Sequence, residues 1–582
     1  MIRYSVSVKD ANAHLFEVVL TASVAPNKPV RCALPAWIPG SYMVREFVRH
    51  LRGPVFTSGG AATSGQKIDK HTWSVTPTAA DLQITYTVYA WDLSVRAAHL
   101  DSTHGFFNGT SLFLQLDDRV DEPCELTIVA PKGVTGSWKV ATTLPAINVN
   151  RAGFGQYQAA NYDELIDHPV EMGSFKHSGF TVLGTQHRVV FTGPCDVDFD
   201  RLTNDLTKIC AEQIQLFEPI TIQAPASQAP STQAPSTQAP FSEYLFMTQV
   251  TGDGYGGLEH RSSTALICVR EDLPFKGMKG TPKGYVQFLG LCSHEYFHSW
   301  NVKRIKPARF TPYDLTQENY TQLLWLFEGF TSYYDDLILL RSGVIDLPTY
   351  LDLLAATITK VMQESGRLVQ SVAQSSFDSW IKYYRQDENS PNSIVSYYTK
   401  GSLVALCLDL TIRSRTNGTR SLDDVMRALW QLQRGLGEDE FGAVVSQATG
   451  FDLSTEINTW TQTTSDLPLR ALLEAAGYAW TETREAHPDI GMRLAQRNQD
   501  LVITVCHEGR PAQRAGLSAQ DVIVAMDGIR TNDSQLKARI ARKAPGDSVQ
   551  IHAFRRDELK TFTLRLAAPV LASVRLSRTS GE

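Results

Sequence analysis

The chain has 582 residues, of which 43% are hydrophobic and 20% charged, with a formal net charge of -6 at pH 7. This is the composition of a globular protein that is too long for a single core, so we expect about three domains. The slightly acidic balance gives no reason to expect nucleic acid or an anionic membrane as a partner, and no apolar stretch reaches the roughly 18 residues of a spanning helix.

Residues 1–172 are expected to form a β-rich domain. Alternating runs such as 82–89 and 124–129 are separated by Gly, Pro and Asp turns. The N-terminus alternates like a strand and lacks the apolar block of a signal peptide, so we expect a cytoplasmic protein, or a periplasmic one if a leader has been removed. The eight cysteines are scattered singly without C-x-x-C spacing, which indicates reduced thiols.

Longer helical segments prevail from about residue 173 to residue 475. Apolar residues recur at three and four spacing over 198–217 and 350–362. Between these segments, the low-complexity stretch 223–240 repeats Gln-Ala-Pro with Ser and Thr, and a Pro at every fifth position forbids both helix and ladder pairing. We therefore expect a flexible surface loop inside this domain.

The C-terminal part, 476–568, returns to short strands. A turn at Asp527-Gly528 and a helix at about 534–543 separate them. The strand-like runs are 501–505, 522–526 and 549–554.

A His-Glu-x-x-His motif lies in an apolar segment, 285–302, that has the length of a buried helix. Residues four apart share one face of a helix, so His294 and His298 present two imidazoles to one point. Glu295 lies one step further round, where it can bind a metal-held water and pass its proton to a leaving amine. The motif predicts one Zn²⁺ per chain. Two capped core histidines are the alternative, but they would be costly in so apolar a helix.

A catalytic zinc takes a third protein ligand and keeps a fourth position open. Glu318 follows His298 by 20 residues, the spacing of thermolysin-like enzymes, but it lies in a polar segment that suits an ordinary helix start. Glu328 follows by 30 residues, and its neighbours are strongly apolar, so an unpaired carboxylate there would be expensive. We therefore predict Glu328 as the third ligand.

Two further motifs resemble those of the gluzincin aminopeptidases. The W-L-x-E-G-F-x-x-Y block around Glu328 is similar to theirs, and Tyr398-Thr399-Lys400-Gly401 is similar to their Y-x-K-G motif. The resemblance implies that Tyr398 stabilises the tetrahedral oxyanion, which suits a phenol. The neighbouring Tyr397 is the alternative position, and aromatic core is the alternative role for both.

The segment from Gly254 to His260 resembles the G-x-M-E-N strand of the same enzymes, which implies that Glu259 binds the free α-amino group of the substrate. Gly256 and Gly257 would let a peptide lie along the strand edge. The sequence G-G-L-E-H, with H-E-Y-F-H-x-W-N-x-K-R and the block 34–42, resembles a narrower group, the glycyl aminopeptidase family.

That resemblance implies a multidomain α+β fold. It comprises an N-terminal β-sandwich-like domain at 1–172, a thermolysin-like and mostly α catalytic domain at 173–475, and a C-terminal PDZ domain at 476–568. It also implies an aminopeptidase for peptides with N-terminal Gly or Ala. The longer gap before Glu328 leaves the shape of the cleft open.

The segment 509–517 resembles bacterial protease PDZ domains. In such a domain Ile490, Gly491 and Met492 are expected to receive a peptide C-terminus along an open strand edge. A groove that only packs against the catalytic domain is an equal alternative.

Three functions therefore remain open: a zinc aminopeptidase, a PDZ-guided zinc endopeptidase or amidase, and a catalytically silent peptide-binding protein. The intact set of motif residues argues against the last, because binding alone has no use for it.

Overall fold

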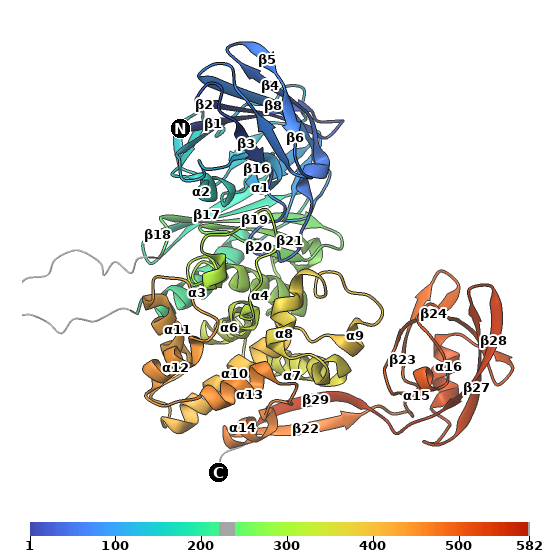
Figure 1. Ribbon diagram of the computed structural model, residues 1–582. Coiled ribbons are helices and arrows are strands. Elements are labelled where there is room, and N and C mark those ends of the chain that lie inside the picture. The colour runs from blue at the N-terminus through green and yellow to red at the C-terminus, as the bar shows by residue number, and fades with distance from the viewer. Residues whose placement is uncertain (220–238, 580–582) are drawn as a thin grey trace, which may run out of the picture. The chain divides into compact units, whose positions relative to one another are not determined.

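The computed structural model describes residues 1–219 and 239–579 (Figure 1). All but the last two positions of the loop expected at 223–240 lie outside the described residues. The chain forms two compact units, each assembled from separate segments. They are Met1–Asn319 with Tyr334–Ile345 and Leu429–Gly437, and Tyr320–Tyr333 with Asp346–Ala428 and Glu438–Glu582. Within the described part, no helix is long and apolar enough to cross a membrane.

The N-terminal part of the first unit is sheet-rich, as predicted. Alternation gives its strands one buried face: in β2 (Leu15–Ser23), Phe16, Val18 and Leu20 are buried between partly exposed neighbours. The largest sheet runs in the order β14 (Ala146–Val149), β15 (Gly155–Ala159), β12 (Cys124–Ile128), β1 (Ile2–Asp10), β2, β8 (Asp81–Tyr89), β4 (Leu51–Ser58) and β5 (Ala61–Thr63). Only the β1–β12 pair of this sheet is parallel among the described strands.

Two four-stranded sheets and two short helices complete this part. One sheet is β13 (Lys139–Ala141), β16 (Val170–Gly173), β10 (His104–Phe107) and β9 (Ala98–Leu100). The other is β11 (Gln115–Leu116), β3 (Val30–Ala33), β7 (Thr72–Val75) and β6 (Gly65–Lys67). The helices are α1 (Gly109–Leu112) and α2 (Tyr162–Ile166).

A five-stranded sheet carries the elements that position the site. Its order is β17 (Lys176–Val182), β18 (Thr185–Thr192), β19 (Glu243–Thr251), β21 (Ser263–Val269) and β20 (Gly256–Glu259), so β20 is an edge strand. Helix α3 (Phe199–Phe217) begins where Asp198 accepts a hydrogen bond from the Arg201 N–H. Helix α4 (Lys283–Phe297), expected from the apolar segment, packs against β20 and β21.

The part of the second unit before residue 476 is mostly helical. Its central helix, α10 (Thr399–Arg415), is buried along nearly its whole length. The others are α5 (Leu324–Phe327), α7 (Leu347–Gln363), α8 (Val372–Phe377), α9 (Ser390–Ser393), α12 (Phe441–Thr449), α13 (Ser454–Gln462) and α14 (Leu469–Ala475). Helices α6 (Gly329–Arg341) and α11 (Leu422–Gln431) have residues in both units.

The C-terminal part of the chain, expected to be a PDZ domain, has the predicted short strands. Its sheet runs β23 (Met492–Arg497), β24 (Asp500–Cys506), β25 (Val522–Met526), β27 (Ser548–Arg555) and β28 (Glu558–Arg565), with β26 (Ile529–Arg530) on β25. Helices α15 (Pro511–Arg514) and α16 (Asp533–Ile540) cover it, and α16 is the helix expected at 534–543.

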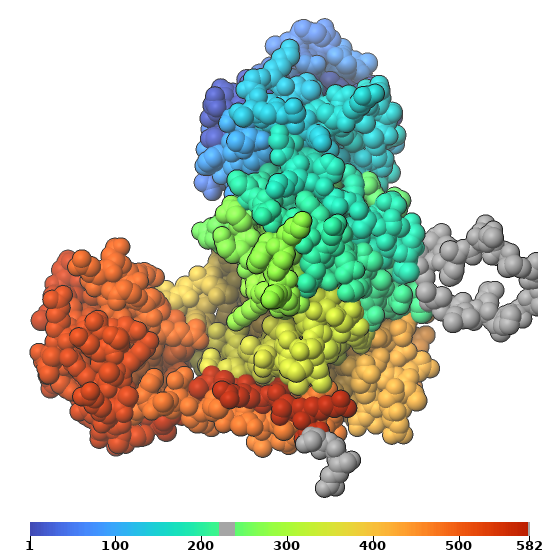
Figure 2. Space-filling view, turned by 180° about the vertical axis from the view of Figure 1, so that it is seen from behind, coloured from blue at the N-terminus to red at the C-terminus, as the bar shows by residue number. Residues whose placement is uncertain are grey.

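The chain continues beyond residue 568 into a strand that the sequence did not suggest. Strand β29 (Leu571–Arg578) pairs with β22 (Tyr478–Arg484) ahead of the PDZ sheet. The Val574 N–H donates to Thr359 Oγ1 on α7 at 2.9 Å. Figure 2 shows the C-terminal strand as a dark red band along the yellow residues of this helix. The two strands that flank the PDZ domain in the chain therefore pair with each other.

Candidate active site

Helix α4 carries both predicted histidines at its C-terminal end. His294 lies in the last turn and His298 caps the helix. Their Nε2 atoms are 3.1 Å apart, with the ring planes inclined by 85°. The two imidazoles point to one place, as their spacing of four residues predicts.

Partners on the opposite ring nitrogens determine both tautomers. Asp335 Oδ2 on α6 is 3.1 Å from His294 Nδ1, and the Asn301 carbonyl is 2.7 Å from His298 Nδ1. Because these partners are acceptors, each neutral ring carries its proton on Nδ1 and its lone pair on Nε2. Two lone pairs that face each other at 3.1 Å repel one another unless a cation binds both. This donor set therefore suits a metal ion.

The carboxylate of Glu295 lies directly against the edge strand β20. It is buried, and a Cβ added at Gly257 would lie 2.1 Å from Glu295 Oε1. Only glycine leaves room for the carboxylate at this position. Gly257 thus has a packing role besides the expected one of receiving a peptide.

Glu259 lies at the end of the same strand and is only 3% exposed. Its Oε1 has no hydrogen-bond partner among the described residues. A Cβ at Gly40, where φ is +91°, would lie 2.5 Å from Oε2, so the block 34–42 reaches this carboxylate. Beside it, Arg96 Nη2 donates to the Gly257 carbonyl at 3.4 Å. A buried carboxylate with one oxygen unused by the chain is suited to an ammonium group.

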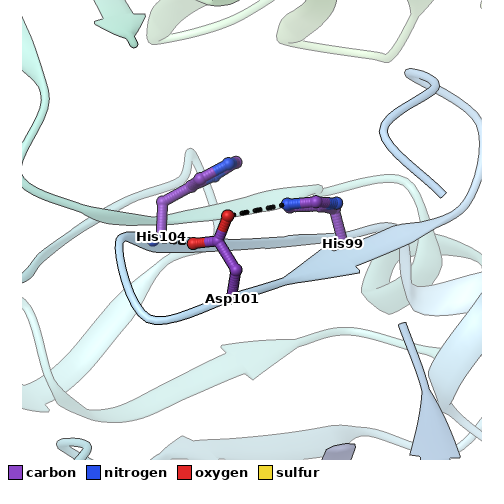
Figure 3. Close-up of side chains that lie close together, drawn as sticks. All are labelled: His99, Asp101 and His104. Atoms are coloured by element: carbon purple, nitrogen blue, oxygen red, sulfur yellow. Dashed lines mark hydrogen bonds and ion pairs between the residues drawn. The ribbon is translucent and has the colours of Figure 1, made fainter. Parts of the chain in front are cut away.

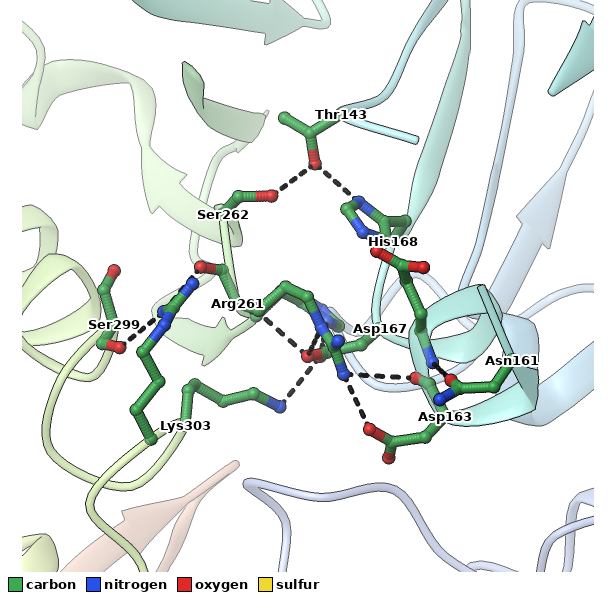
Figure 4. A network of polar contacts seen from close by, with 12 residues as sticks. Thr143, Asn161, Asp163, Asp167, His168, Arg261, Ser262, Ser299 and Lys303 are labelled. Carbon is green, nitrogen blue, oxygen red and sulfur yellow. Dashed lines mark hydrogen bonds and ion pairs between the residues drawn. The ribbon is translucent and has the colours of Figure 1, made fainter. Parts of the chain in front are cut away.

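The buried carboxylate of Asp167 joins two segments of the site (Figure 4). It accepts hydrogen bonds from His260 Nδ1 at 3.0 Å and Arg261 Nε at 2.9 Å, both just after β20. It also accepts from Lys303 Nζ at 2.8 Å, two residues after the Asn301 carbonyl that orients a histidine. Burial alone would raise the pKa of Asp167, but the cations Lys303 and Arg261 hold it well below its ordinary value.

The second unit presents Glu328 at the end of α5, where it is 2% exposed. The next residue, Gly329, lies so close to α10 that a Cβ would be 2.5 Å from the Cα of Gly401. The E-G and K-G motifs therefore pack backbone to backbone. Glu318, the alternative ligand, is partly exposed and belongs to no potential metal-ligand cluster within the described residues.

Tyr398 caps the N-terminus of α10, and its side chain is partly exposed. Its hydroxyl lies 3.0 Å from that of Tyr384, a residue that no sequence motif indicated. Tyr397 is fully buried, with its ring 4.7 Å from that of Tyr398, and burial raises its pKa well above the ordinary value. Of the two adjacent tyrosines, Tyr398 is thus the accessible one.

The expected carboxylate-binding loop of the PDZ domain begins the edge strand β23. Within it, the Gly491 N–H donates to Asp489 Oδ1 at 2.8 Å, and Arg510 Nε donates to Asp489 Oδ2 at 2.8 Å. A carboxylate of the chain itself thus engages one of the loop amides. The peptide-binding role of Ile490, Gly491 and Met492 stays a prediction.

Comparisons with known proteins find similarity in three successive parts of the chain. Family models match at residues 3–174 (Peptidase M61 N-terminal domain), 287–404 (M61 glycyl aminopeptidase) and 488–566 (PDZ domain). A crystal structure of an aminopeptidase N family protein from Idiomarina loihiensis has a TM-score of 0.93 and 39% identity, covering 100% of this chain and 98% of that chain.

More distant similarity extends to an M1 zinc metallopeptidase from Deinococcus radiodurans. Its TM-score is 0.49 with 12% identity, over 80% of this chain and 94% of that one. No curated protein matches the chain.

Proposed function

The chain belongs to the M61 glycyl aminopeptidase family of metallopeptidases, and we propose that it is a zinc aminopeptidase that removes small N-terminal residues, Gly or Ala, from peptides. The observation that carries this proposal is the pair of imidazole lone pairs of His294 and His298 that face each other at 3.1 Å. Their spacing and oriented tautomers are those of ligands to a metal ion, with His298 buried and His294 partly buried.

We assign the metal to His294, His298 and Glu328. Each of these side chains offers one atom of a type that zinc binds, a ring nitrogen or a carboxylate oxygen. Two imidazoles and one carboxylate are a common donor set of catalytic zinc. When bound, zinc would lower the pKa of a coordinated water and polarise the scissile carbonyl.

Glu295 would take the proton of the attacking water and return it to the leaving amine. Its burial against Gly257 supports this role, because the tight packing fixes the position of the carboxylate. Tyr398 would donate a hydrogen bond to the developing oxyanion. The Tyr384 hydroxyl, 3.0 Å away, would orient that of Tyr398.

Glu259 would confer exopeptidase character by pairing with the free α-amino group of the substrate. The edge strand β20 supports this assignment, since an extended peptide can pair along Gly256 and Gly257 and end its N-terminus at the Glu259 carboxylate. The backbone of Gly40 closes one side of that carboxylate.

Hydrolysis of Gly-, Ala- and Leu-p-nitroanilide, each beside its N-acetylated form, tests the proposal. The metal-loaded protein should cleave the free Gly and Ala compounds, and a chelator should abolish cleavage until zinc is restored. Equal cleavage of the acetylated compounds would instead identify an endopeptidase or amidase. No cleavage of any compound by zinc-loaded protein would overturn the proposal.

A further inference from the structure

A second group of metal-ligand side chains lies in the N-terminal part, on the hairpin of β9 and β10 (Figure 3). His99, Asp101 and His104 each offer one ligand atom, and these atoms lie within 4.8 Å of one another. Both histidines are buried, with exposed fractions of 5% and 6%. None of these residues belongs to the active site described above.

The turn between the strands fixes the carboxylate of Asp101. Its Oδ1 accepts hydrogen bonds from the Thr103 N–H at 2.6 Å and the His104 N–H at 3.1 Å. The other oxygen, Oδ2, is directed at His99 Nε2 at 3.4 Å, as Figure 3 shows. The backbone of the hairpin thus holds one oxygen ready between the two histidines.

Glu171 adds a second carboxylate from the neighbouring strand β16. It is 4% exposed, and its Oε1 lies 3.3 Å from His104 Nδ1. Zinc bonds of about 2.0–2.1 Å in tetrahedral directions place ligand atoms roughly 3.3 Å apart. The contacts of His99 with Asp101 and of His104 with Glu171 both have this separation.

Polar atoms of this group are buried without adequate partners. Among the described residues, His99 Nδ1 has no hydrogen-bond partner, and His104 Nδ1 and Glu171 Oε1 have only their mutual contact at 3.3 Å. All three side chains line one small pocket. A buried polar atom without a partner costs about 1–3 kcal/mol, so the unpaired ring nitrogen of His99 favours a ligand at this place.

We propose that His99, Asp101, His104 and Glu171 form a second metal site, for a divalent transition-metal ion such as zinc. The two imidazoles are borderline ligands that suit Zn²⁺, which also accepts carboxylate oxygens, whereas a hard ion such as Ca²⁺ prefers oxygen alone. The imidazole rings lie stacked, 4.8 Å apart and inclined by 26°. Since an ion lies in the plane of each ring that binds it, one of the rings turns when the metal binds.

A metal ion at this site would stabilise the packing of the β9–β10 hairpin against the five-stranded sheet. The pocket is also lined by Met247 and Thr248 of β19 and by Ala265 and Leu266 of β21. The chain between Trp91 and His99 contains Arg96, which bonds the Gly257 carbonyl. The ion therefore has a structural role, with only an indirect link to the edge strand.

Counting bound metal separates this site from the active site. After equilibration with buffered zinc at micromolar free concentration, inductively coupled plasma mass spectrometry should find two zinc ions per wild-type chain. The variant His294→Ala/His298→Ala should keep one ion, and His99→Ala/His104→Ala should also keep one. A matched control is His14→Ala, because His14 stacks on Trp91 at 3.9 Å but belongs to no ligand group, and it should keep two.

The active-site double variant also provides a readout that does not depend on catalysis. In that background, zinc should raise the melting temperature. The milder change Asp101→Asn should weaken zinc binding at least tenfold, with an unchanged circular dichroism spectrum. Zero ions in the active-site variant, half-saturation only at millimolar zinc, or no effect of Asp101→Asn would each overturn the proposal.

Discussion

Gly257 and Glu295 occupy adjoining space: a Cβ at Gly257 would lie 2.1 Å from Glu295 Oε1. This contact joins the edge strand β20 to helix α4, which carries His294 and His298. Each element therefore constrains the other, although their residues are far apart in the chain.

Gly257→Ala is expected to displace the Glu295 carboxylate and to lower kcat by about 100-fold, because a misplaced base costs this much. Bound zinc should be unchanged. The matched control is Gly179→Ala in β17 of the same sheet, where a Cβ would come no closer than 3.6 Å to its nearest neighbour. Steady-state kinetics and metal analysis check both. Wild-type kcat in Gly257→Ala would show that Glu295 needs no such precise placement.

Asp335→Asn is expected to weaken zinc binding by about 10–100-fold, since it removes the carboxylate that orients His294. The neighbouring Asp336→Asn is the control on the same helix. This variant makes the same chemical change one residue away and keeps the contact of Asp335 with His294. Burial and the charge of Asp335 raise the pKa of Asp336 well above its ordinary value. Competition with a chromogenic chelator measures both affinities. Equal affinities of the two variants would exclude the orienting role.

Tyr398→Phe is expected to lower kcat by about 100-fold with little change in KM, because the lost hydrogen bond acts on the transition state. Tyr397→Phe should stay close to the wild type, as that ring is fully buried. Kinetics on Gly-p-nitroanilide distinguish them. A larger loss in Tyr397→Phe than in Tyr398→Phe would reverse the assignment.

Asp167→Asn is expected to cost about 3–5 kcal/mol of stability at pH 7, since Lys303 and Arg261 would remain buried without their counter-ion. The depressed pKa of Asp167 makes the wild-type stabilisation complete above about pH 4, and it is lost as the pH falls through the folded-state value. The difference in urea unfolding free energy between the two proteins should therefore shrink from pH 7 to pH 3. A difference that stays constant over this range would refute the charge-based explanation.

The sequence was sufficient to predict those features that depend on the spacing of neighbouring residues along the chain. The i, i+4 histidines and Glu295 follow from helix periodicity, and the apolar surroundings of Glu328 pointed to a buried carboxylate that the structure also finds buried. The alternation of β2 and the helical spacing of α3 likewise foretold the sheet-rich and helical parts of the fold.

The supporting residues were beyond sequence reasoning, because they act at long range. Asp335 reaches His294 across 41 residues, and Asp167 reaches Lys303 across 136. Gly40 meets Glu259 from another domain, which no spacing rule can anticipate. Strand β29 was missed because its partner β22 precedes the PDZ domain in the chain, whereas β29 follows it.

The most direct test of the central claim is to measure zinc content and turnover together in Glu295→Gln. Our account predicts one active-site zinc, as in the wild type, with cleavage of Gly-p-nitroanilide lowered by at least about 1,000-fold, because the amide cannot accept the proton of the attacking water. Turnover at the wild-type rate by this zinc-loaded variant would contradict the account.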